Sequence, residues 1–217
     1  MSAERIQQER HYAVIPVDSS VASFATLRSK MEALRDDDQV RVVVLDVRQP
    51  GFEAEDDPAV LRDFVLPSIA AWAGEMNLSR VMAGLFCDIR IGESSQRLTW
   101  MPSMRGSGRA RFADVLGVSE DDVMTALAEG MLQCGLVSRV VDGDPLEEAE
   151  RLAQAIASRG PIATRFAKEA IWRGLTLPLE HALRYETDLT LLLQTTNDRA
   201  EGVEAFLNKR PPLFTGT

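Results

Sequence analysis

Residues 40–47 read VRVVVLDV, and this segment decides the fold class. It is rich in β-branched residues and almost continuously apolar, whereas a strand with one solvated face alternates between apolar and polar residues. Such a run is typical of a strand buried on both faces of a parallel sheet. Because parallel neighbours need crossover connections, usually helices, the segment predicts an α/β fold.

The flanking sequence supplies the remaining strands and their crossovers. A helix is expected after Ser23, a favoured N-cap residue type, because Phe24, Leu27, Met31 and Leu34 recur at helical spacing. The acidic run 36–38 that follows is interpreted as a solvated loop. A second helix is expected over 77–86, and further strands are expected at 12–17, 69–72, 87–91 and 136–141.

The second half of the chain has the periodicity of helices. Asp144 and Pro145 form an N-cap and N1 pair, and Glu147 completes a capping-box pattern. The expected helices cover 144–158, 161–174, 179–195 and 199–208. The leucines of 179–195 make a face wider than a surface helix needs, which leaves core packing and a subunit interface both open. We expect an α/β core over 1–142 and a helical region over 143–217.

Composition excludes several classes of partner. The 217 residues include 24 Lys and Arg against 33 Asp and Glu, for a net charge of −9. Without a basic stripe, nucleic acid and anionic membranes are not expected as partners. No apolar run approaches the roughly 20 residues of a membrane span, and residues 1–10 lack a signal-peptide core. The isolated Cys87 and Cys134 form no disulfide framework, so a cytoplasmic location is expected.

Common catalytic motifs are absent from the sequence. The sequence contains no phosphate-binding GxxxxGK[ST] loop, no GxGxxG after a strand and no GxSxG nucleophile elbow. His11 and His181 stand apart from cysteine or carboxylate clusters, so we interpret them as structural or surface residues and expect no metal site.

Longer segments resemble a known family over nearly the whole chain. In the second half these are 135–141 (GLVSRVV), 163–171 (ATRFAKEAI), 177–183 (LPLEHAL) and 201–211. In the first half, GFEAEDD at 51–57 resembles the "AFxAGxD" loop of this family. PSIAAWAG at 67–74 resembles its "PVIAAVNG" strand. CDIRI at 87–91 resembles a "CDIRIA" segment. The ensemble is similar to the crotonase superfamily, the enoyl-CoA hydratase/isomerase family.

This resemblance implies a crotonase-like ββα spiral core with a C-terminal helical oligomerisation region, assembled as homotrimers or hexamers. It implies a coenzyme A thioester as substrate or ligand, with no further cofactor. The family's oxyanion hole uses two backbone N–H groups, whose positions fall on Asp56 and Ser79. Phe206 and Lys209 match an aromatic-x-x-lysine that lies near the CoA of a neighbouring subunit, although an exposed C-terminal lysine is also commonplace.

The sequence departs from the family where the chemistry takes place. Glu55 replaces the loop glycine, and Met82 and Pro102 occupy the positions of the two family glutamates. Neither can transfer the protons that hydration of an enoyl thioester requires. Glu75, just after Gly74, is the nearby carboxylate that could serve as a relocated base, and Asp56 and Asp57 are alternatives. The segments 17–24, 58–66 and 104–109 are also shorter than their family counterparts.

Three functions remain open at this point. The first is an enoyl-CoA hydratase/isomerase-like enzyme of acyl-CoA metabolism, supported by the extent of the resemblance. The second is a non-catalytic subunit that serves assembly or regulation of an active paralogue, supported by Met82 and Pro102. The third is decarboxylation or thioester hydrolysis that uses Glu75 or Asp56. Fold alone cannot choose among them, because function resides in the site.

Overall fold

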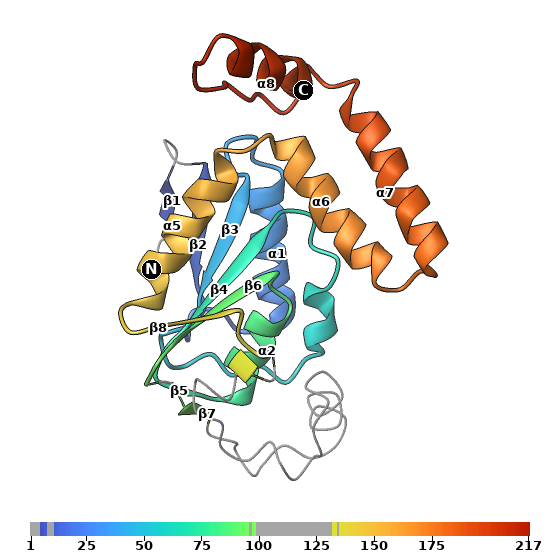
Figure 1. Cartoon of the computed structure of the whole chain (residues 1–217). Coiled ribbons are helices and arrows are strands. Elements are labelled where there is room, and N and C mark those ends of the chain that lie inside the picture. The colour runs from blue at the N-terminus through green and yellow to red at the C-terminus, as the bar shows by residue number, and fades with distance from the viewer. Residues whose placement is uncertain (1–4, 8–10, 96, 99–131, 134) are drawn as a thin grey trace.

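The computed structural model describes residues 5–7, 11–95, 97–98, 132–133 and 135–217, and a mostly parallel sheet lies at its centre (Figure 1). The strand order is β1-β2-β3-β4-β6-β8, in which only β1 is antiparallel to its neighbour. The strands are β1 (Arg5–Gln7), β2 (Tyr12–Pro16), β3 (Val42–Asp46), β4 (Ser68–Trp72), β6 (Ile89–Glu93) and β8 (Arg139–Val141). The short strands β5 (Glu75–Met76) and β7 (Arg97–Leu98) form a separate pair.

Helices cover both faces of this sheet. One face packs against α1 (Phe24–Arg35) and α2 (Leu78–Leu85), and the other against α5 (Pro145–Ala157). Alternate residues of each strand therefore enter two different cores: Val43 and Leu45 enter the first, and Val42 and Val44 the second. The double coverage explains the unbroken apolar run of β3, and it confirms the predicted parallel α/β sheet.

Two predicted strands begin later than expected. The segment 87–91 is a strand only from Ile89, because Cys87 and Asp88 form the turn after α2, where the Cys87 N–H donates to the Gly84 carbonyl. The segment 136–141 is a strand only from Arg139. Before Arg139, the Arg90 guanidinium donates to the carbonyl oxygens of Gly135 and Leu136, at 3.3 and 2.6 Å. These side-chain hydrogen bonds replace the backbone pairing that a strand would make there.

Side-chain caps fix the helix starts. The Ser23 side chain accepts a hydrogen bond from Thr26 N, as predicted, and Asp144 accepts one from Leu146 N. In the described residues no hydrogen bond joins Glu147 to the Asp144 N–H, so only the Asp144 half of the predicted capping box forms. Asp144 instead binds Arg48, which lies beyond β3.

The C-terminal helices are α6 (Pro161–Gly174), α7 (Leu179–Leu193) and α8 (Asn197–Leu207). In Figure 1, α6 lies between α7 and the sheet, and α8 crosses one end of the molecule. Leu189 is buried, but Leu183, Leu191 and Leu192 are 54%, 61% and 56% exposed. Core packing within one chain therefore does not explain these three leucines. Among the described residues, no helix has the length and apolarity needed to cross a bilayer.

The close approach of α2 to β4 gives a test of the packing. A Cβ atom at Gly84 would lie 2.1 Å from Nε1 of Trp72, a side chain with no exposed surface. Gly84→Ala should therefore lower the free energy of unfolding by about 3 kcal/mol, the upper range for overpacking a filled core. Urea denaturation measures this change. Gly143→Ala is the matched control because nothing lies within 4 Å of its Cβ position, and an equal loss there would contradict the packing.

Candidate functional site

Hydrogen bonds tie the loop after β3 to the start of α2. Asn77 Nδ2 donates to the Phe52 carbonyl oxygen at 3.0 Å. The Ser79 hydroxyl accepts from Ala54 N at 3.1 Å and donates to the Ala54 carbonyl oxygen at 3.2 Å. These contacts bring together the two segments that carry the sequence-predicted backbone donors.

The N–H groups of Asp56 and Ser79 are both available. Ser79 is the second residue of α2, so its N–H has no acceptor within the helix. In the described part of the chain, neither N–H donates a hydrogen bond to another group. Unpaired N–H groups at a helix start favour an anion, and the helix dipole adds to this preference. The start of α2 at Ser79 is therefore a favourable place for a negatively charged oxygen.

The Asp56 carboxylate caps α1. Its Oδ1 accepts from Phe24 N and its Oδ2 from Ala25 N, both at 2.9 Å. A carboxylate at a helix N-terminus is stabilised by the dipole. To act as a base, Asp56 would have to break both hydrogen bonds. The neighbouring Glu55 side chain is exposed, and it makes no hydrogen bond or ion pair with any residue that the structure describes.

Arg80 is a buried cation at the start of α2 that the sequence analysis did not single out. Its side chain is almost fully buried, and its guanidinium donates to the carbonyl oxygens of Val47 at 3.0 Å and Glu75 at 2.6 Å. Burial lowers the pKa of Arg80, and the charge of Asp46 opposes this shift. The guanidinium still remains charged, since arginine does not deprotonate in proteins. A lone cation among the apolar residues of segment 77–86 was the signal that could have identified it.

A chain of charges connects this region to α5. Arg48 Nε donates to Asp46 Oδ1 at 2.7 Å, and Arg48 Nη1 lies 2.7 Å from Asp144 Oδ2. The hydrogen bond that Arg48 donates to Asp46 is the main cause of the raised pKa of Arg48. The carboxyl end of β3 is thereby fixed to the residue that begins α5.

The remaining candidates for proton transfer occupy different surroundings. Met82 is 6% exposed and packs in the core, and its thioether has no proton to give. Glu75 is exposed on β5, where its backbone carbonyl is bound by Arg80. Pro102 lies outside the described residues. Cys87 is fully buried, and this burial raises the pKa of its thiol to about 12, which leaves no reactive thiolate.

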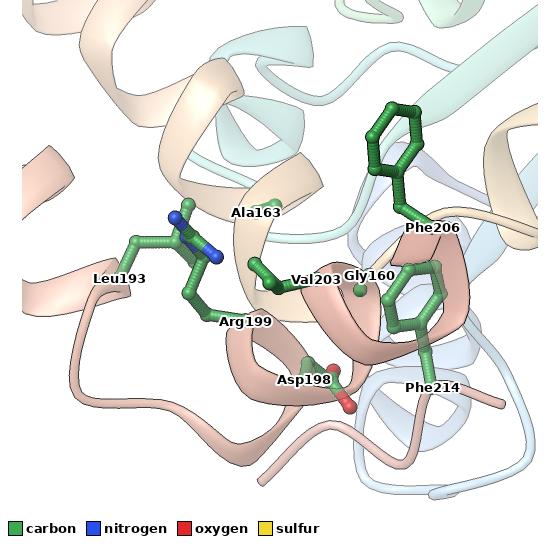
Figure 2. A pocket seen from close by; sticks show the side chains of 9 residues that line it. Gly160, Ala163, Leu193, Asp198, Arg199, Val203, Phe206 and Phe214 are labelled. Atoms are coloured by element: carbon green, nitrogen blue, oxygen red, sulfur yellow. The ribbon is translucent and has the colours of Figure 1, made fainter. Parts of the chain in front are cut away.

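Phe206 and Lys209 lie far from these donors within one chain. Phe206 is 83% exposed and lines an apolar pocket of about 470 Å³ with Val203, Phe214 and the start of α6 (Figure 2). Arg41, the residue before β3, donates to the Phe214 carbonyl oxygen at 2.7 Å, which places this pocket near the amino ends of the strands. Asp56 and Ser79 instead follow the carboxyl ends of β3 and β4.

No group of His, Cys, Asp and Glu side chains among the described residues has the arrangement of a metal site.

Comparisons with known proteins agree on one family. The enoyl-CoA hydratase/isomerase family model matches residues 48–217. A probable enoyl-CoA hydratase of Mycobacterium bovis is 34% identical over 160 residues, which span 69% of this chain but only 62% of that protein. The 2,3-dehydroadipyl-CoA hydratase of Escherichia coli is 33% identical over 172 residues, 73% of this chain and 66% of that protein. An enoyl-CoA hydratase subunit I from Geobacillus kaustophilus superposes with a TM-score of 0.79 at 26% identity, over 99% of this chain and 98% of that chain.

The cap formed by Asp56 can be tested separately from any activity. Asp56→Ala removes two acceptors from the α1 N-terminus and should lower the free energy of unfolding by about 1–2 kcal/mol. Thermal or urea denaturation measures the loss. Glu55→Ala removes the same charge one residue earlier and should change stability by less than about 0.5 kcal/mol. Equal effects of the two substitutions would refute the cap.

Proposed function

Because the chain belongs to the enoyl-CoA hydratase/isomerase family, we propose that it binds an acyl-CoA thioester and polarises its carbonyl through the N–H groups of Asp56 and Ser79. The observation that carries this proposal is the pair of unpaired donors on two segments tied by Asn77 and Ser79. Donors held in place before the reaction stabilise an enolate oxygen without reorganisation, which is worth several kcal/mol in a dry site.

Standard hydration of an enoyl thioester is not part of this proposal. Hydration needs positioned carboxyl groups to activate water and to protonate the α-carbon. Met82 is buried and carries no such group, and proline stands at position 102. Glu75, exposed on β5, is the candidate base for a different reaction, either decarboxylation through the enolate or thioester hydrolysis.

A non-catalytic role is the second candidate. The exposed leucines of α7 and the exposed Phe206 of α8 support a role in assembly, including assembly with an active paralogue. In this role the protein holds a thioester or a partner subunit and transfers no proton. Turnover of an acyl-CoA separates the two candidates.

A neighbouring subunit is required for the complete CoA site in this proposal. Phe206 lines a pocket near the amino ends of the strands, on the other side of the sheet's length from the Asp56 and Ser79 donors of its own chain, and Lys209 follows it three residues later. In a homotrimer or hexamer they approach the CoA of an adjacent copy, where the ammonium of Lys209 suits a phosphate. The exposed apolar residues of α7 would then be buried between copies.

The thioester site predicts binding without hydration. Acetyl-CoA should bind in calorimetry, whereas crotonyl-CoA should show little or no hydration, measured as loss of the enoyl thioester absorbance. Ser79→Ala frees the loop from α2 and should weaken acetyl-CoA binding roughly tenfold, the equivalent of one hydrogen bond of about 1.4 kcal/mol. Ser29→Ala, which removes a hydroxyl on the exposed surface of α1, is the control. Rapid hydration, or no binding of any CoA compound, would refute the proposal.

The assembly predicts a mass near 72 kDa for a trimer, three times the 24.0 kDa chain, in chromatography with light scattering. Leu191→Glu with Leu192→Glu should give a 24 kDa monomer that binds acetyl-CoA more weakly, since Phe206 and Lys209 of the adjacent copy are lost. Gln154→Glu, an exposed position on α5, should change neither property. A wild-type monomer would contradict this arrangement.

A further inference from the structure

A second cavity, of about 680 Å³, lies between α6 and the segment 62–65, which follows the short helix η1 (Pro58–Leu61). Residues 62–65 precede β4, and Phe86, which also lines the cavity, precedes β6. The cavity is therefore at the amino ends of these parallel strands. Asp56 and Ser79 follow the carboxyl ends of β3 and β4, so the cavity is separate from the thioester site.

Positive charge gathers in this cavity although the chain has a net charge of −9. Two of its cations are neutralised locally. Lys168 Nζ lies 2.8 Å from Asp88 Oδ2, and Arg173 Nε lies 3.0 Å from Glu169 Oε1. Because each of these cations is paired with a carboxylate, the two pairs add no net charge to the cavity wall.

The other two cations, Arg62 and Arg165, are unpaired. Their guanidinium groups make no ion pair or hydrogen bond with any residue that the structure describes, and both residues are exposed. They come from different elements, the segment after η1 and helix α6. Asp63 is the one lining carboxylate outside the two ion pairs, so two unpaired cations face one unpaired anion. The ionised side chains of the cavity that have no partner among the described residues, Arg62, Arg165 and Asp63, therefore carry a net positive charge.

Trp172 gives the cavity a flat apolar wall. The residue is 44% exposed, and its indole Nε1 donates to Asp88 Oδ1 at 3.0 Å. Asp88 thus holds Lys168 and orients Trp172 at the same time. Because the polar atom of the indole is satisfied, the exposed surface of the ring is hydrocarbon, and it lines the same space as Phe166.

We propose that this cavity binds a small organic anion, with a carboxylate or phosphate between Arg62 and Arg165 and an aromatic ring against Trp172. The planar guanidinium fork matches both kinds of anion, and it pairs with them more specifically than a lysine ammonium does. A volume of about 680 Å³ lies within the usual range for small-molecule sites. Aromatic stacking and two charge-assisted contacts together define the ligand class, and the position of the cavity at the amino ends of the strands separates it from the thioester site.

Calorimetry with phenyl phosphate, benzoate and inorganic phosphate tests this site on the whole chain. We expect saturable binding of phenyl phosphate that weakens as the salt concentration rises. Arg62→Gln with Arg165→Gln should reduce its affinity at least tenfold. The control, Arg159→Gln with Arg184→Gln, removes two exposed charges outside the cavity and should change the affinity less than twofold.

The aromatic wall has its own variant. Trp172→Leu should lower the affinity for phenyl phosphate several-fold and leave the affinity for inorganic phosphate unchanged. Thermal unfolding checks that each variant is folded. Preference for phenyl phosphate over benzoate assigns the anion as a phosphate, and the reverse preference assigns it as a carboxylate; either result supports the site. Absence of saturable binding, an equal loss in the charge control, or equal affinity of wild type for phenyl phosphate and inorganic phosphate would overturn the proposal.

Discussion

The hydroxyl of Ser79 is the contact on which the functional interpretation depends. By accepting from Ala54 N and donating to the Ala54 carbonyl, it fixes a strand-end loop against the start of a helix. Two backbone donors on separate segments can act on one oxygen only if their separation is held before the ligand arrives. A glycine here would leave more room for a ligand but could make neither of these bonds.

The acidic loop creates an electrostatic conflict that distant residues resolve. A carboxylate beside a developing enolate oxygen raises its energy, yet Asp56 directs its charge to the N-terminus of α1. The buried guanidinium of Arg80 adds positive charge nearby and binds the carbonyl oxygens of Val47, after β3, and Glu75, on β5. An anion-binding role is therefore compatible with an acidic loop sequence.

Local sequence predicted the elements whose causes are local. The β-branched run at β3, the Ser23 cap and the Asp144 cap all follow from neighbouring residues, and the structure confirms them. The role of Asp56 could not be predicted in this way, because its partners lie 31 and 32 positions earlier in the chain. The late start of β8 likewise depends on the long-range contacts of Arg90 with Gly135 and Leu136. For α7, intrachain and intersubunit burial produce the same leucine pattern, so periodicity alone could not decide.

The placement of α5 has a consequence for how the protein is made. Ala149, Ala153 and Ala157 of α5 pack against the sheet face that includes Tyr12 and Val44. These two strand residues precede α5 by more than a hundred positions in the chain. During translation this face stays open to water until α5 has emerged, and an uncovered apolar sheet invites aggregation. This second core can therefore be completed only after α5 has been synthesised.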